Sequence, residues 1–167
     1  YAFSLYSLTL QSKYNLSLEQ LDTMAFAAAA GNNFGVHVGL FYDYCGAAAT
    51  MFMGAAIGVP AWALLYLALA DDCSAGGCAM PVWTLHASHF WRGQAQLIGD
   101  VAAVGTVVAS FPGDRGQAVG VAKAMLGLSA SLGAIAYERL FTPDMVSFVR
   151  FIGIWWTACC AVGALGL

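Results

Sequence analysis

The chain has 167 residues, of which 60% are hydrophobic and only 9% are charged. Its mean hydropathy of +0.73 excludes an ordinary soluble domain, in which about 25% of residues carry a charge, and indicates a lipid bilayer as the solvent. A formal net charge of −3, with no cluster of Lys and Arg, excludes nucleic acid as a partner.

Apolar blocks separated by short polar links predict one transmembrane domain, residues 1–167, in the all-α class. A spanning helix needs about 20 apolar residues, and most of the blocks reach that length. We expect a polytopic bundle of about six spanning helices, the first represented only by its last turns. The expected helices cover residues 1–11, 18–44, 47–70, 82–110, 116–137 and 144–167.

Boundary signals mark two of the links between these helices. Ser17 and Gln20 have the spacing of a capping box, which predicts that the second helix begins directly after Ser17. Pro112 and Gly113 end the fourth helix, because proline lacks the N–H that a helix needs and both residues are typical of turns. A short charged turn therefore separates the fourth helix from the fifth.

Glycines recur along the second and third expected helices. Small residues spaced by four let two helices in lipid approach until their backbones touch. We therefore expect close helix packing at five positions, namely Gly31, Gly35, Gly39, Gly54 and Gly58.

Two cysteines lie in the link between the third and fourth helices. Cys73 and Cys78, with four residues between them, can form a disulfide if this side of the membrane is oxidising, and two free thiols are the alternative. The spacing of Cys and His residues predicts no metal site.

The fourth expected helix is the most polar of the set. His89, Arg92, Gln96 and Asp100 advance by three, four and four residues, so they form one stripe about 80° wide. Charged side chains at membrane depth face a bundle interior or a wet cavity and find partners there. The stripe is a candidate site for a substrate or a proton, and a satisfied network that only supports the fold is the alternative.

The fifth expected helix places one lysine among small residues. Gly116, Gly120, Lys123 and Gly127 lie within about 80° of one another on a helix of 3.6 residues per turn. This groove predicts a helix-packing seam, and Lys123 is either a packing residue paired with a carboxylate or a cation in a cavity. The candidate carboxylates are Asp43, Asp100 and Asp114.

Two further interactions between distant residues are expected. Asp43 and Arg115 are the natural pair for a latch between helices. His37, His86 and His89 could ligate a metal-centred pigment, because neutral imidazole is a common axial ligand.

Several fixed offsets around the fifth helix resemble a known family. Residues 111–129 resemble the FPxxRGxxVGxxKxxxGLS stretch of the nodulin-like family, which belongs to the major facilitator superfamily. The opening letters YAFSLYS and the later pair Gln20-Leu21 are similar to the end of that family's first helix and the start of its second.

A second, shorter motif agrees with this resemblance. Gly39, Asp43 and Gly46 fit the facilitator signature GxxxDxxG, which lies between the second and third helices. The signature normally continues with basic residues, where this chain has alanines at 47–49.

The resemblance implies the amino-terminal, six-helix half of a transporter, with the first and fourth helices lining a central cavity. It implies secondary transport of a small polar or anionic solute by alternating access. A carboxy-terminal half or a second copy of the chain would complete the cavity, and membrane lipids would surround it.

The other function that we consider is a structural subunit of a large membrane assembly, such as a photosynthetic or respiratory supercomplex. Neighbouring subunits would then dock on the glycine stripes. No cofactor is expected for a transporter, whereas chlorophyll or lipid would accompany such a subunit. The sequence has no nucleophile with a base and no phosphate loop, which argues against an enzyme. It indicates an integral membrane protein without indicating which membrane.

Overall fold

The computed structural model describes residues 3–71, 73, 78 and 80–166. Nearly all of this part of the chain is helical and none of it forms a strand, which confirms the all-α class. The elements are α1 (Phe3–Tyr14), α2 (Leu18–Asn33), α3 (Val36–Ala70), α4 (Val82–Ser110), α5 (Arg115–Ala136), the π-helical segment η2 (Tyr137–Phe141) and α6 (Met145–Gly166).

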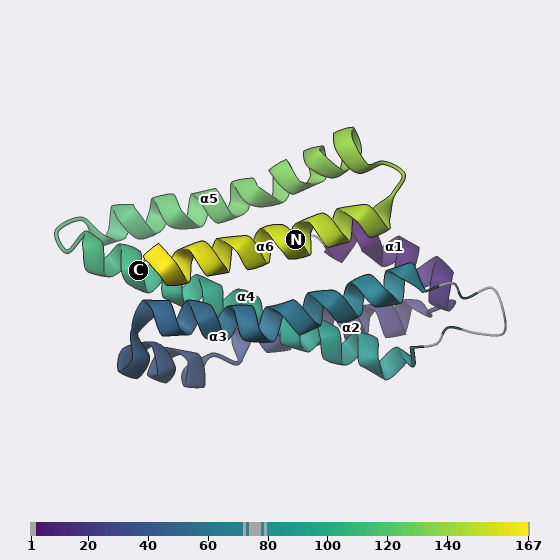
Figure 1. Cartoon of the computed structure of the whole chain (residues 1–167), viewed down its shortest axis with the longest axis horizontal. Helices are drawn as coiled ribbons and strands as arrows, with labels where there is room; N and C mark the ends of the chain where they lie inside the picture. Colours follow the sequence, from purple (N-terminus) through teal and green to yellow (C-terminus); the bar gives the residue numbers. More distant parts are fainter. Residues whose placement is uncertain (1–2, 72, 74–77, 79, 167) are drawn as a thin grey trace.

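The bundle is organised around α3 and α4, which pack against each other (Figure 1). α2 packs on α4, and α6 packs on α3. α5 (green in Figure 1) runs along one edge of the bundle, and none of its described side chains is buried. The chain therefore has a packed group of helices and one helix that is held loosely.

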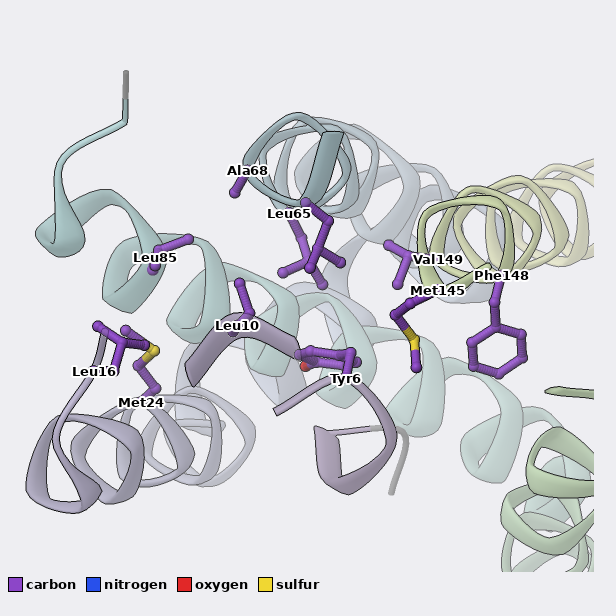
Figure 2. Close-up of a cluster of buried hydrophobic side chains, with 11 residues drawn as sticks. Tyr6, Leu10, Leu16, Met24, Leu65, Ala68, Leu85, Met145, Phe148 and Val149 are labelled. Carbon is purple, nitrogen blue, oxygen red and sulfur yellow. The ribbon is translucent and has the colours of Figure 1, made fainter. Parts of the chain in front are cut away.

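The hydrophobic core lies where α1 meets the ends of the other helices. Figure 2 shows Tyr6 and Leu10 of α1 between Leu65 of α3, Leu85 of α4 and Val149 of α6. Each of these side chains is at most 1% exposed. A helix of 12 residues is marginal when isolated, so this burial is what fixes α1 to the bundle.

The second expected helix, residues 18–44, is interrupted in the structure. α2 ends at Asn33 and the next helical segment begins at Val36. Asn and Gly both have low helix propensity, and Gly35 is the N-cap residue of α3. These residues end the helix, although a mostly apolar run continues beyond them.

Gln94 of α4 stabilises this interruption. Its side-chain amide donates to the carbonyl oxygens of Gly31 at 2.6 Å and of Phe34 at 2.9 Å. The last carbonyl groups of a helix have no partner within that helix. Gln94 is 2% exposed, so it supplies buried hydrogen bonds that lipid could not supply.

The boundary expected near Gly46 is a kink within α3. Gly46 has a φ of 80°, a conformation that glycine adopts without the steric cost that other residues incur. The hydroxyl of Thr50 donates to the Gly46 carbonyl at 2.8 Å. The second and third expected helices thus differ from the observed ones mainly in where the chain breaks.

The expected capping box is confirmed at the start of α2. The backbone N–H of Gln20 donates to the Ser17 hydroxyl oxygen at 3.2 Å, and the backbone N–H of Ser17 donates to the Gln20 side chain at 3.0 Å. These two reciprocal bonds satisfy donors that the first turn of a helix leaves free.

Of the two alternatives considered for Cys73 and Cys78, the structure has the disulfide. Both sulfur atoms lie close to Asp71. A thiolate is the form of cysteine that binds a metal, and the disulfide leaves neither sulfur in that form, so the group does not make a metal site.

Four of the five predicted packing glycines lie at close helix contacts. A Cβ atom on Gly31 would overlap the Phe90 carbonyl oxygen, and one on Gly58 would overlap the ring of Trp156. A Cβ atom on Gly35 would lie 3.1 Å from the Leu97 side chain, and one on Gly54 would lie 3.1 Å from the Ile98 side chain. At Gly39 no described atom lies within 4 Å of the place where its Cβ would be, so the described residues make no close contact there.

Three described stretches are long and apolar enough to cross a membrane, judged by length and composition. They are Leu18–Ala70, Arg115–Phe141 and Met145–Gly166. α4 has 29 residues, which is enough to span, but its polar side chains set it apart from these three. The first of these stretches contains both α2 and α3.

Candidate functional site

The four polar residues predicted on α4 share one face of the helix and meet two different environments. His89 is fully buried, whereas Gln96 is exposed. Arg92 and Asp100 are intermediate. We call His89 and Arg92 the closed end of the stripe, and Gln96 and Asp100 the open end.

His89 uses both of its ring nitrogens within the chain. Nδ1 lies 2.7 Å from the Leu85 carbonyl oxygen, and Nε2 lies 3.3 Å from the Tyr6 hydroxyl. Because a carbonyl only accepts, Nδ1 carries the proton and Nε2 accepts from Tyr6. The edge of the Phe3 ring closes the site at a centroid distance of 5.4 Å.

Arg92 lies between two aromatic rings. Its Cζ atom is 5.1 Å from the ring centroid of Tyr6 on α1 and 5.0 Å from that of Trp62 on α3. A cation over an aromatic face is stabilised by about 2 kcal/mol or more when desolvated. The Nη1 atom is buried and has no hydrogen-bond partner among the described residues. Aromatic faces therefore surround this guanidinium where a carboxylate would be the usual partner.

The open end of the stripe faces a cleft between α2, α4 and α5, with a volume of about 360 Å³. Its polar lining consists of Asn32 of α2, Gln96 and Asp100 of α4, and Lys123 of α5. The rest of the lining is apolar, from α2 and α5. The cleft is an open groove in the described part of the chain, and its converging polar groups make it the candidate solute site.

Lys123 and Asp100 form a salt bridge across this cleft, with 2.5 Å between Nζ and Oδ2. Asp100 is thus the partner of Lys123 among the three carboxylates considered. The lysine side chain is 47% exposed and the aspartate side chain is 32% exposed. Because α5 buries none of its described side chains, this salt bridge is a principal polar contact between α5 and α4.

The expected latch between Asp43 and Arg115 does not form in the part of the chain that the structure describes. Both residues are exposed. Asp43 lies on the helical segment before the kink at Gly46, and Arg115 is the first residue of α5. Exposed ion pairs contribute little free energy, so no strong force draws these two charges together.

The packing seam expected on α5 has no partner among the described residues. Gly116, Gly120 and Gly127 have no described neighbour within 4 Å of the place where a Cβ would lie. The reason is that no described helix covers this face. Lys123 is the residue of the predicted groove that makes a contact with another helix.

The structure does not bring His37, His86 and His89 together as a set of pigment ligands. The nitrogens of His86 lie 3.0 Å from the Thr23 hydroxyl and 3.0 Å from the Val82 carbonyl, and those of His89 are engaged as described above. His37 is exposed, with its ring 5.3 Å from that of Phe34. His86 and His89 therefore have no free nitrogen with which to bind a pigment.

Sequence reasoning missed four residues of this region. Tyr6 and Trp62 enclose Arg92, Gln94 stabilises the end of α2, and Asn32 lines the cleft. Tyr6 lies in the YAFSLYS letters that resemble the family's opening, so it could have been noted there. The other three carry no local signal, because their roles depend on contacts between helices.

An all-α bundle with apolar helices long enough to cross a bilayer defines the class of a membrane protein. The family model described as nodulin-like matches residues 1–165, nearly the whole chain. The chain therefore belongs to the nodulin-like family, and the resemblance inferred from its motifs is confirmed. Neither the curated proteins nor the solved structures include a match to it.

Proposed function

We propose that this chain is the amino-terminal part of a secondary transporter for a small polar or anionic solute. The observation that carries the proposal is the cleft lined by Asn32, Gln96, Asp100 and Lys123. Ionisable groups in an apolar bundle are expensive and usually mark a solute or ion pathway. Membership of the nodulin-like family supports a transporter-like protein.

The openness of the cleft fits this proposal. Both members of the salt bridge keep a substantial part of their side chains exposed. Transport by alternating access places the solute between two bundles that rock about a central site. A carboxy-terminal half or a second copy of this chain would close the cleft on its open side.

The test uses the complete natural protein that contains these residues, reconstituted in liposomes. A uniformly ¹³C-labelled cell extract is supplied outside, and mass spectrometry identifies the labelled compounds inside. We expect at least one compound to accumulate well above its level in protein-free liposomes.

Matched substitutions make this test specific to the cleft. Asp100→Asn should reduce the accumulation, whereas Asp22→Asn should not, because Asp22 is an exposed carboxylate of α2 that does not line the cleft. Failure of every compound to accumulate would overturn the proposal. An equal effect of the two substitutions would remove the cleft from it.

A structural subunit of a larger membrane assembly is the second candidate. The observation that favours it is the uncovered face of α5, where Gly116, Gly120 and Gly127 have no neighbour among the described residues. A neighbouring subunit, with lipid or chlorophyll at the contact, would cover that face. Stable co-purification with a multi-subunit complex, together with no accumulation in liposomes, would favour this function over transport.

A further inference from the structure

The charged lining of the cleft is balanced. Within the described part of the chain, Asp100 contributes one negative charge to the lining and Lys123 contributes one positive charge. A solute with a net negative charge would be repelled by Asp100, and one with a net positive charge would be repelled by Lys123. The cleft therefore favours no single sign of charge.

We infer that the cleft binds a zwitterion, a small solute that carries both an ammonium group and a carboxylate. This inference rests on the proposed transport function and specifies its class of substrate. The solute's ammonium group would bind Asp100, and its carboxylate would bind Lys123. Each charge of the salt bridge would then exchange its present partner for one on the solute.

This exchange explains why a zwitterion is preferred over an ion of one sign. A simple anion that binds Lys123 leaves Asp100 without a partner, and a simple cation does the reverse. Once a carboxy-terminal half or a second copy covers the cleft, as the proposed function requires, an uncompensated charge there is strongly unfavourable. Asn32 and Gln96 of the lining can both donate and accept hydrogen bonds, so they suit the remaining polar groups of the solute.

The same exchange links binding to the position of α5. The salt bridge joins α4 to α5, and α5 buries no described side chain of its own. When the solute takes both charges, the direct link between the two helices is replaced by one through the solute. Arg92 does not line the cleft, so it takes no part in this exchange.

The test compares four probes of three carbons that differ in charge. They are β-alanine, propionate, propylammonium and propionamide, titrated by calorimetry into the complete protein in detergent at neutral pH. We expect β-alanine to bind at least about tenfold more tightly than any other probe, which corresponds to about 1.4 kcal/mol. Propionate or propylammonium binding as tightly as β-alanine would overturn the inference, and so would no binding of β-alanine.

Two substitutions should change the preference in opposite directions. Asp100→Asn leaves Lys123 as the charged group of the lining, so propionate should become the preferred probe. Lys123→Gln leaves Asp100, so propylammonium should become preferred. Asp22→Asn, the exposed control, should keep the preference for β-alanine. Size-exclusion chromatography selects folded protein for each titration, and an unchanged preference in both cleft variants would contradict the inference.

The outcomes separate this inference from the transport proposal. Accumulation of simple anions alone from the labelled extract would overturn the zwitterion and leave transport in place. The predicted order of probes without accumulation of any compound would support the cleft as a zwitterion site and overturn transport.

Discussion

The closed and open ends of the α4 stripe carry similar polar residues in different surroundings. At the closed end, Tyr6 and Trp62 cover the guanidinium of Arg92, and Tyr6 also donates to His89. At the open end, Asp100 reaches a cleft and meets a lysine from a loosely held helix. The comparison teaches that periodicity identifies a polar face, whereas the neighbouring helices decide whether its groups are sealed or accessible.

The largest expected effect breaks the packing that surrounds the closed end. In Gly31→Ala, the new methyl group would overlap the Phe90 carbonyl oxygen of α4. Overpacking of this kind costs about 1–3 kcal/mol, so the thermal midpoint in detergent should fall clearly. Gly120→Ala is the matched control on α5, where no described atom lies within 4 Å. Equal midpoints for the two variants would show that α2 and α4 are not in close contact.

A smaller effect is expected within the closed end itself. Tyr6→Phe removes the hydroxyl that donates to Nε2 of His89 and keeps the ring that covers Arg92. Loss of one buried hydrogen bond costs about 1 kcal/mol, which thermal unfolding should detect. The control is Tyr44→Phe, at a tyrosine that is 87% exposed. Loss of the same size in the control would contradict the role given to the Tyr6 hydroxyl.

At the open end, the effect on stability should be smaller still. Lys123→Gln breaks a salt bridge whose two side chains are partly exposed, and such pairs contribute about 0–1 kcal/mol. Thermal unfolding should therefore change little, while accumulation of solute in liposomes falls. A large loss of folded protein would mean that the pair supports the fold and does not serve the solute.

The smallest effect concerns Asp144, which lies outside both ends of the stripe and directly before α6. Hydrogen bonds from Ser147 hold the pKa of this carboxyl below its ordinary value of 3.8. The larger effect comes from the Ser147 side chain, and the smaller from its backbone N–H, whose nitrogen is 3.0 Å from Asp144 Oδ1. A lowered pKa means that the ionised cap stabilises the fold fully above pH 3.8 and loses its contribution as the pH falls through the folded-state pKa.

An acid titration of unfolding checks this expectation. Wild type should lose slightly more stability below about pH 4 than Asp144→Ala, because only the wild type has a carboxylate to protonate. Identical acid profiles for the two proteins would show that the cap does not contribute.

Much of the fold could be predicted because its signals are local. The capping box at Ser17 and the polar stripe of α4 both follow from spacing along one helix. The interruption after Asn33 could not be predicted in the same way, because Gln94, some 60 residues away, supplies the hydrogen bonds that make it tolerable. Asn32, Asn33 and Gly35 are weak local signals of a helix end, but the mostly apolar run through residue 44 favoured one long helix.

The site shows the same limit. The sequence identified Lys123 and three candidate carboxylates, and only the arrangement of helices selects Asp100. The latch expected between Asp43 and Arg115 failed because a motif gives residue types and not the distance between them. The aromatic pair around Arg92 comes from α1 and α3, so no spacing along α4 could reveal it.

The most direct test measures accumulation per folded molecule for Asp100→Asn and Tyr6→Phe, in liposomes supplied with the labelled extract. We predict that Asp100→Asn keeps its thermal midpoint and loses most of its accumulation. We predict that Tyr6→Phe lowers the midpoint and keeps its accumulation per folded molecule. The reverse pattern would contradict the assignment of solute handling to the open end and of structural support to the closed end.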